Sequence, residues 1–266
     1  MMNKNTFTTI SLAKGEIHLY DFGAIRLHAY QTGDPLSDEV FVVEKDGKGV
    51  VLEAPCFHDS IQALEGYLKD TGLEIAGLLL AYHMAGATLL PQVKRYTTHR
   101  AEEYGHSGGG KALIDNFTAT FGESFDNTIH TATDYIGEGM VTIGGIEFII
   151  RQTEEAFDVE IPAIHAVYTH MLGHDCHSIV AGTGHADGMI SQLKEYLEKG
   201  YDLILTSHYT PEDLKDAQTK IDYLEELKAI AERCGNADAF KSEMHRKYPG
   251  YSGENYLDMT AGFFFP

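Results

Sequence analysis

Several features that would assign a protein to a particular class are missing from this sequence. The 266 residues include no tryptophan and only three cysteines, Cys56, Cys176 and Cys234, which form no C-x-x-C pair. This wide spacing fits reduced thiols better than a disulfide framework. No apolar run approaches the roughly 20 residues of a membrane-spanning helix, and the opening MMNKNTFTTI lacks the regions of a signal peptide. We therefore expect a cytoplasmic protein with no membrane association.

Positive charge is also scarce. Twenty Lys and Arg residues stand against 40 Asp and Glu residues, which gives a net charge of −20 at pH 7. Such a surface repels phosphate backbones, and the sequence holds no basic patch that would offset this repulsion. Nucleic acid is therefore not an expected partner, and a small-molecule substrate or ligand is.

Linkers and repeats are absent as well, so the length fits one large α/β domain over residues 1–266. Within it, residues 212–266 are expected to form a C-terminal helical extension with an aromatic tail. The tail carries Tyr251, Tyr256 and Phe263 among other apolar side chains, and an exposed run of this kind favours aggregation. It must cover its own core, line a pocket or contact a second copy, and we favour a pocket wall or a homodimer.

The stretch that organises the chain is EIAGLLLAYHMAGATLL, residues 74–90. Leu78, Leu79 and Leu80 form an apolar run typical of a strand that is buried on both faces. The run stops at His83, and small residues follow it. Open α/β sheets carry their chemistry at the carboxyl ends of such strands, so His83 is a candidate site residue. A capping histidine at the rim of the core is the alternative.

The elements before this strand follow a particular order. Residues 40–43 and 50–52 flank a turn at residues 46–49 and predict a β-hairpin. A helix with apolar Ile61, Leu64 and Leu68 comes next, and then the strand that ends before His83. This order resembles the opening half of the metallo-β-lactamase fold, and the resemblance spans roughly residues 16–211. It implies an α/β fold of the αββα four-layer sandwich type.

The metal-binding motif of that family, T-H-x-H-x-D-H, is largely lost here. Laid on the motif, His83 takes the first histidine, while Ala85, Ala87 and Thr88 take the remaining ligand positions. The sequence LEAP, residues 52–55, stands where the family has a D-T-G-like turn. The resemblance therefore implies the scaffold without the usual two-metal site.

Three later segments also resemble the family. Glu160 begins a segment, E-I-P-A, that is similar to the E-A-P-A-E-like segment of alkylsulfatase-like enzymes, where glutamate is a ligand; a surface glutamate is the alternative. An apolar strand over residues 201–206 runs into His208 and resembles the final ligand segment, so His208 would face His83. Gly182 stands where the bridging aspartate would be expected.

The resemblance thus implies a reduced metal centre. His83, Glu160 and His208 would hold a single zinc or iron ion with one open position, and its water would attack an ester, lactone, amide or sulfate-like bond. The candidates to replace the missing water-orienting aspartate are Asp175, His165 and Tyr209. The alternative is a non-catalytic member of the fold that has no metal and binds a small molecule or a protein.

Two further segments carry open interpretations. THMLGHDCH, residues 169–177, is the densest group of metal-binding side chains and fits a solvated or interface turn or an adventitious second metal site. YGHSGGGK, residues 104–111, matches a phosphate loop except that Ala112 replaces the Ser or Thr that would bind magnesium. We interpret it as a flexible loop that leads into a helix over residues 112–121 and acts as a lid.

Overall fold

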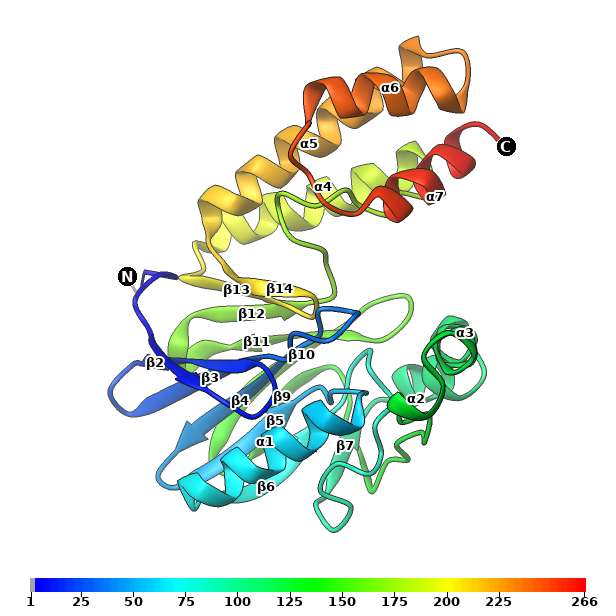
Figure 1. Cartoon of the computed structure of the whole chain (residues 1–266). Coiled ribbons are helices and arrows are strands. Elements are labelled where there is room, and N and C mark those ends of the chain that lie inside the picture. The colour runs from blue at the N-terminus through cyan, green and yellow to red at the C-terminus, as the bar shows by residue number, and fades with distance from the viewer. Residues whose placement is uncertain (1–2) are drawn as a thin grey trace. The chain divides into compact units, whose positions relative to one another are not determined.

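The computed structural model describes residues 3–266, which form two compact units. The first unit runs to Met171 and resumes over Asp202–Pro211, and the second comprises Leu172–Tyr201 and Glu212–Pro266. The expected C-terminal extension, residues 212–266, therefore lies in the second unit together with a segment from inside the chain. Figure 1 shows the order of the elements.

The first sheet has eight strands that lie side by side in chain order. The first five strands run alternately up and down, so that each is antiparallel to the one before it. Each of the last three strands runs parallel to the strand before it. The strands are β1 (Thr8–Ser11), β2 (Glu16–Asp21), β3 (Ile25–Gln31), β4 (Glu39–Lys45), β5 (Lys48–Leu52), β6 (Glu74–Leu79), β7 (Arg95–Thr97) and β8 (Asp134–Tyr135).

The β4–β5 hairpin confirms the prediction for residues 40–52. Its two-residue turn is Asp46-Gly47, and both residues have positive φ, 50° and 77°. This conformation matches the twist of antiparallel strands, which is why Asp-Gly is favoured there.

The second sheet has six strands in the order β14-β13-β12-β11-β10-β9. A hairpin at Gly144-Gly145 joins β9 to β10, and β12 runs parallel to β13. The strands are β9 (Gly139–Ile143), β10 (Ile146–Gln152), β11 (Phe157–Ile161), β12 (Ala166–Thr169), β13 (Leu203–Thr206) and β14 (Tyr209–Glu212).

The core of the first unit lies between the two sheets. Phe41 of the first sheet and Tyr168 of the second are fully buried, with ring centroids 6.1 Å apart. Helix α1 (His58–Thr71) packs its apolar side chains on the outer face of the first sheet, where the Tyr67 hydroxyl bonds to His28. His28 is only 2 % exposed. It is buried because α1 covers that face of β3.

The glycine-rich segment is largely helical. It joins α2 (His99–His106) to α3 (Gly109–Phe121), followed by the short helix η1 (Gly122–Ser124), and a second short helix, η2 (Pro162–Ile164), precedes β12. A Cβ on Gly110 would lie 2.7 Å from the ring of Tyr104. The glycines thus permit close packing at a tight corner between two helices, which the sequence pattern alone had suggested was a loop.

The second unit is helical in its regular structure. Helix α4 (Thr183–Lys199) packs along α5 (Leu214–Arg233), and α6 (Ala237–Lys247) packs on α7 (Glu254–Phe264). Asp213 caps α5 through the backbone N–H groups of Lys215 and Asp216. No helix among residues 3–266 has the length and apolar character needed to cross a bilayer.

Two glycines of the first unit should respond in opposite ways to a methyl group. In Gly77→Ala the new Cβ would lie 2.6 Å from the Tyr96 ring, whereas Gly66 in α1 has open space around it. We expect Gly77→Ala to lower the free energy of unfolding by about 1–3 kcal/mol and Gly66→Ala to raise it by about 0.5–1 kcal/mol. Urea unfolding measures both, and equal signs would contradict the close approach of the Tyr96 ring to Gly77.

Candidate metal centre

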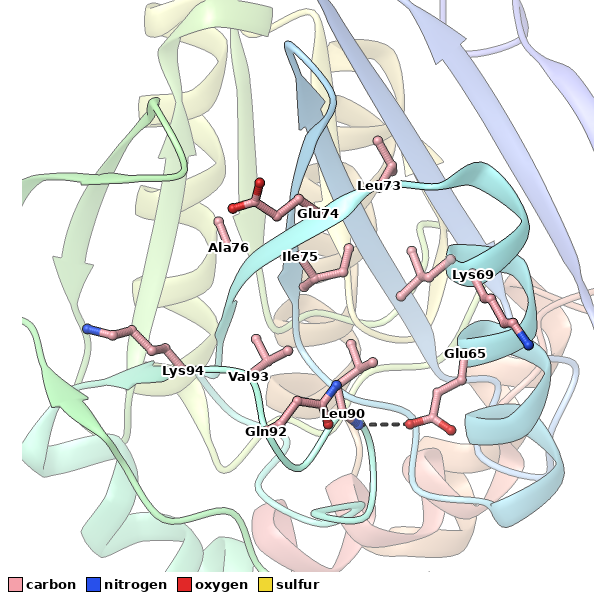
Figure 2. A pocket seen from close by; sticks show the side chains of 11 residues that line it. Glu65, Lys69, Leu73, Glu74, Ile75, Ala76, Leu90, Gln92, Val93 and Lys94 are labelled. Carbon is pink, nitrogen blue, oxygen red and sulfur yellow. Dashed lines mark hydrogen bonds between the residues drawn. The ribbon is translucent and has the colours of Figure 1, made fainter.

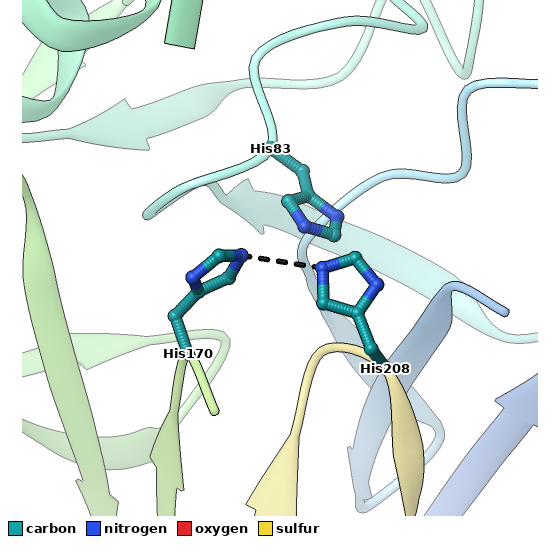
Figure 3. Close-up of side chains that lie close together, drawn as sticks. All are labelled: His83, His170 and His208. Atoms are coloured by element: carbon teal, nitrogen blue, oxygen red, sulfur yellow. Dashed lines mark hydrogen bonds between the residues drawn. The ribbon is translucent and has the colours of Figure 1, made fainter. Parts of the chain in front are cut away.

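Three histidines meet at the carboxyl ends of strands in the first unit. His83 follows β6, His170 follows β12 directly, and His208 follows β13. Their ring centroids lie 4.9 Å (His83 to His208), 5.2 Å (His170 to His208) and 5.4 Å (His83 to His170) apart. One ring nitrogen from each lies within 4.8 Å of the other two. Figure 3 shows the three rings facing a common space.

The chemistry of these donors fits a transition metal. Imidazole is a good ligand for zinc and iron, provided that the donating nitrogen is unprotonated. Burial lowers the pKa of both His83 and His170, which keeps these rings neutral. The planes of the rings are inclined at 47° to 84° to one another, so the rings do not stack and their lone pairs can converge.

His208 differs from the other two. Burial alone would lower its pKa, but the neighbouring carboxylate of Asp38 outweighs burial and raises it. Its Nε2 lies 3.3 Å from His170 Nε2, and a hydrogen bond between two ring nitrogens needs a proton on one of them. The raised pKa favours the proton on His208, and a bound metal ion would displace it.

A buried carboxylate holds the strand ends that carry these histidines. Glu53, which is fully buried, accepts hydrogen bonds from the backbone N–H groups of Tyr82 (2.8 Å) and His83 (3.0 Å). It also accepts the hydroxyl of Tyr168 at 2.6 Å, and the Ser207 hydroxyl lies 2.6 Å from the same Tyr168 oxygen. Tyr168 and Ser207 stand two and one residues before His170 and His208, so Glu53 is linked to all three segments.

The ring of Tyr82 supports His170 from one side. The two rings stack with centroids 4.7 Å apart and planes 18° from parallel. The Tyr82 hydroxyl is held in turn by Thr153 and Asp158, at 2.9 and 3.2 Å. This contact fixes the orientation of the His170 ring.

Glu160 is not part of the three-histidine cluster. It lies on β11 opposite Val167 of β12 and bonds to Arg151 at 2.8 Å. Val167 stands three residues before His170, which places Glu160 about 10 Å along the sheet from that end of β12. The structure therefore brings together the two predicted histidines, His83 and His208, and adds His170 where Glu160 had been expected.

The predicted water-orienting residues are also dispersed. His165 has left-handed backbone (φ 50°) at the start of β12, the end opposite His170, with Nδ1 4.0 Å from Asp202. Tyr209 begins β14, where its backbone oxygen accepts the Thr206 hydroxyl. Asp175 belongs to the second unit, where its backbone oxygen accepts the Ser252 N–H.

The second unit has its own cluster of metal-binding side chains, His174, Glu212 and Asp216. His174 Nδ1 lies 2.8 Å from Glu212 and its Nε2 lies 3.6 Å from Asp216. Because both ring nitrogens face carboxylates, the geometry suits an imidazolium, and the bond to Glu212 raises the pKa of His174. Buried Lys220, whose pKa burial lowers to about 8, donates to the Gly173 and Cys176 carbonyls nearby. His174 and Lys220 thus place two basic groups beside the carboxylates of Glu212 and Asp216.

Figure 2 shows a groove of about 530 Å³ at another place in the first unit. None of the three histidines lines it, so it is separate from the candidate metal centre. It has an apolar floor and a charged rim, formed by Glu65, Leu68, Lys69, Leu73, Glu74, Ile75, Ala76, Leu90, Gln92, Val93 and Lys94.

No protein-family model matches the chain, and no curated protein matches its sequence. Solved structures do match it. The stereoselective inverting sec-alkylsulfatase of Pseudomonas sp. is 14% identical with a TM-score of 0.62, over 95% of this chain and 50% of that chain. A beta-lactamase domain protein from Burkholderia ambifaria is 13% identical with a TM-score of 0.64, over 96% of this chain and 87% of its own. A metallo-beta-lactamase from Erythrobacter litoralis is 11% identical with a TM-score of 0.57, over 82% of this chain and 100% of that chain.

The chain has the metallo-β-lactamase fold. The α/β sandwich predicted from the order of the elements is therefore confirmed. The chain spans 57% of the length of the first matching sulfatase, a double mutant, with a TM-score of 0.65. Because the sequence identities are this low, these similarities are evidence for a shared fold alone.

Two of the positions that the sequence resemblance laid on the remaining motif ligands, Ala85 and Thr88, make structural contacts in this chain. Ala85 is buried in an apolar cluster with Phe57 and Phe125. Thr88 donates its hydroxyl to Asp126 at 2.6 Å, and Asp126 also accepts the hydroxyl of Thr128. These contacts stabilise the conformation of the loop that follows His83.

Replacing Glu53 should weaken the fold and the candidate centre together. In Glu53→Gln an amide would face the donors at Tyr82 and His83, which should cost roughly 2–4 kcal/mol of stability. Tyr168→Phe removes a single hydroxyl and should cost about 1 kcal/mol. Urea unfolding measures the free energy of unfolding and checks that Glu53→Gln loses more of it than Tyr168→Phe. Glu65→Gln is the control, because Glu65 accepts one backbone N–H, from Leu90. Similar losses in Glu53→Gln and Glu65→Gln would contradict the central role of Glu53.

The His174 cluster should make stability depend on pH. Since the folded pKa of His174 is raised, its contribution is full below the unfolded pKa of about 6.5 and is lost as pH rises through the folded value. We expect His174→Gln to cost about 1 kcal/mol near pH 6 and clearly less near pH 8.5. His245→Gln, which removes an exposed pair with Glu254, is the control and should cost little. A cost independent of pH would contradict the imidazolium.

Proposed function

We propose that this chain is a metal-dependent hydrolase in which His83, His170 and His208 hold one zinc or iron ion. The observation that carries the proposal is the convergence of three imidazoles from three separate strand ends at one point. Three protein ligands and one open position are the arrangement of catalytic, as opposed to structural, zinc sites.

A zinc ion bound there would supply a water molecule whose pKa is lowered to about 7 and would polarise the bond to be cleaved. The protein's own residues orient the ligands. Glu53 fixes the backbone at His83, the Tyr82 ring fixes His170, and Asp38 lies beside the outer nitrogen of His208. Such preorganised ligands bind metal without reorganisation of the loops that carry them.

The proposed substrates are small molecules with an ester, lactone, amide or sulfate-like bond. The solved structures of similar fold include a sec-alkylsulfatase and metallo-β-lactamases, which supports hydrolysis as the reaction class. The net charge of −20 disfavours nucleic-acid substrates.

One observation favours a second candidate function, a metal-free protein that binds a small molecule or a protein partner. His170 and His208 already satisfy each other through the 3.3 Å contact between their Nε2 atoms. The donors lost at Ala85 and Thr88 would also be dispensable in a binding protein.

Metal analysis of the full chain separates these functions. We expect one zinc or iron ion per chain, lost on chelation together with hydrolysis of ester, lactone and sulfate substrates. His83→Ala, His170→Ala and His208→Ala should each weaken metal binding by about 100-fold or more.

Glu160→Gln is the matched control, because Glu160 lies away from the cluster beside Arg151. It should keep the metal and the activity. A wild-type chain without metal affinity would favour the binding protein, and loss of metal in Glu160→Gln with retention in His170→Ala would contradict the ligand set.

A further inference from the structure

The outer face of His208 has a defined chemical environment. Its Nδ1 lies 3.2 Å from the carbonyl oxygen of Leu36 and 3.3 Å from Asp38 Oδ1. Both neighbours are acceptors, so Nδ1 must carry a hydrogen. Once a metal ion displaces the proton on Nε2, the ring is neutral and Nε2 is its unprotonated nitrogen, and this is the nitrogen that faces His170.

Asp38 is itself aimed at His208. Its side chain is 1% exposed, and its Oδ1 makes no hydrogen bond within residues 3–266 while lying 3.3 Å from the imidazole. Its other oxygen, Oδ2, accepts the thiol hydrogen of Cys56 at 3.0 Å. The charge of Asp38 also acts on His83, but His208 is the imidazole that one of its oxygens approaches at 3.3 Å. A buried carboxylate placed this close to a ring nitrogen indicates that this imidazole is its functional partner.

The loop that carries Asp38, residues 32–38 between β3 and β4, is built to hold this position. Asp34 Oδ1 accepts the backbone N–H groups of Leu36 (2.9 Å) and Asp38 (3.2 Å), and the Thr32 hydroxyl donates to the Asp38 carbonyl oxygen (2.8 Å). The backbone of the next residue, Glu39, donates to the carbonyl oxygen of Ser207 at 2.7 Å. This last bond joins the neighbours of Asp38 and His208 directly.

We propose that Asp38 is the positioning residue for His208 in the metal centre, which it orients with Nδ1–H outward and Nε2 toward His83 and His170. The inference rests on the proposed function and deepens it. A carboxylate in this place fixes the ring, selects the tautomer that can bind metal and increases the electron donation of the ligating nitrogen. Cys56, through its thiol hydrogen, fixes the carboxylate in turn.

The test measures zinc affinity by competition with a chromophoric chelator for the wild-type chain and Asp38→Asn. The expected result is one zinc ion per chain in both, with affinity lowered about 10- to 100-fold in Asp38→Asn. Asp134→Asn is the control, because this exposed carboxylate pairs with Lys94 on the surface, and it should leave zinc affinity unchanged. Long-range ¹H–¹⁵N NMR of the metal-free protein should show His208 with Nδ1 protonated in the wild type and a mixture of tautomers in Asp38→Asn.

The outcomes distinguish the positioning role of Asp38 from the proposed hydrolase function. If Asp38→Asn keeps the zinc affinity of the wild type and His208 keeps its tautomer, the role of Asp38 is overturned and the proposed hydrolase function stands. A wild-type chain that binds no zinc or iron would overturn both.

A second pair of variants keeps the test decisive if Asp38→Asn does not fold. Cys56→Ala leaves Asp38 Oδ2 without its donor and should lower zinc affinity by roughly threefold or more, whereas Cys56→Ser restores a donor and should preserve it. Equal affinity in these two variants would overturn the proposal.

Discussion

The carboxylate of Glu53 is the constraint on which the candidate metal centre depends. It accepts backbone N–H groups at the end of β6 and, through Tyr168 and Ser207, connects to the segments that carry His170 and His208. A buried carboxylate is costly unless each of its lone pairs finds a donor. The structure supplies those donors from three strand ends, so satisfying one charge also brings three imidazoles together. Asp38 repeats this arrangement on a smaller scale at His208 alone.

Much of the fold could be predicted from local patterns. The hairpins at Asp46-Gly47 and Gly144-Gly145, and the buried strand before His83, follow from turn chemistry and apolar runs that need no distant partner. What failed depends on contacts far along the chain. The apolar residues 179–181 have the composition of a strand but are irregular and lead into α4, and residues 209–212 form β14 although Pro211 is typical of a helix start. Propensity cannot decide such cases, because tertiary packing selects the conformation.

Two of the three histidines of the candidate site could be predicted from the sequence. His83 and His208 follow clear apolar strands, and the structure places them together. His170 also follows a strand directly, but β12 has only four residues and the crowded segment after it resembled a solvated turn. Glu160 stands in a segment that resembles the alkylsulfatase-like branch, yet it lies on β11 opposite Val167 and bonds to Arg151. Glu53 gave no signal, because its partners are backbone N–H groups and the hydroxyl of Tyr168, which lies 115 residues away in the chain.

The separation of the three histidines in sequence bears on the order of folding. In the family motif T-H-x-H-x-D-H, two histidine donors stand only two residues apart in the chain. Here Ala85 and Thr88 have removed that local pair, and His83, His170 and His208 meet only when both sheets have formed. Contacts of such long range form late and slowly. Metal uptake in this chain would therefore be a final step that stabilises a finished structure by mass action and cannot nucleate it.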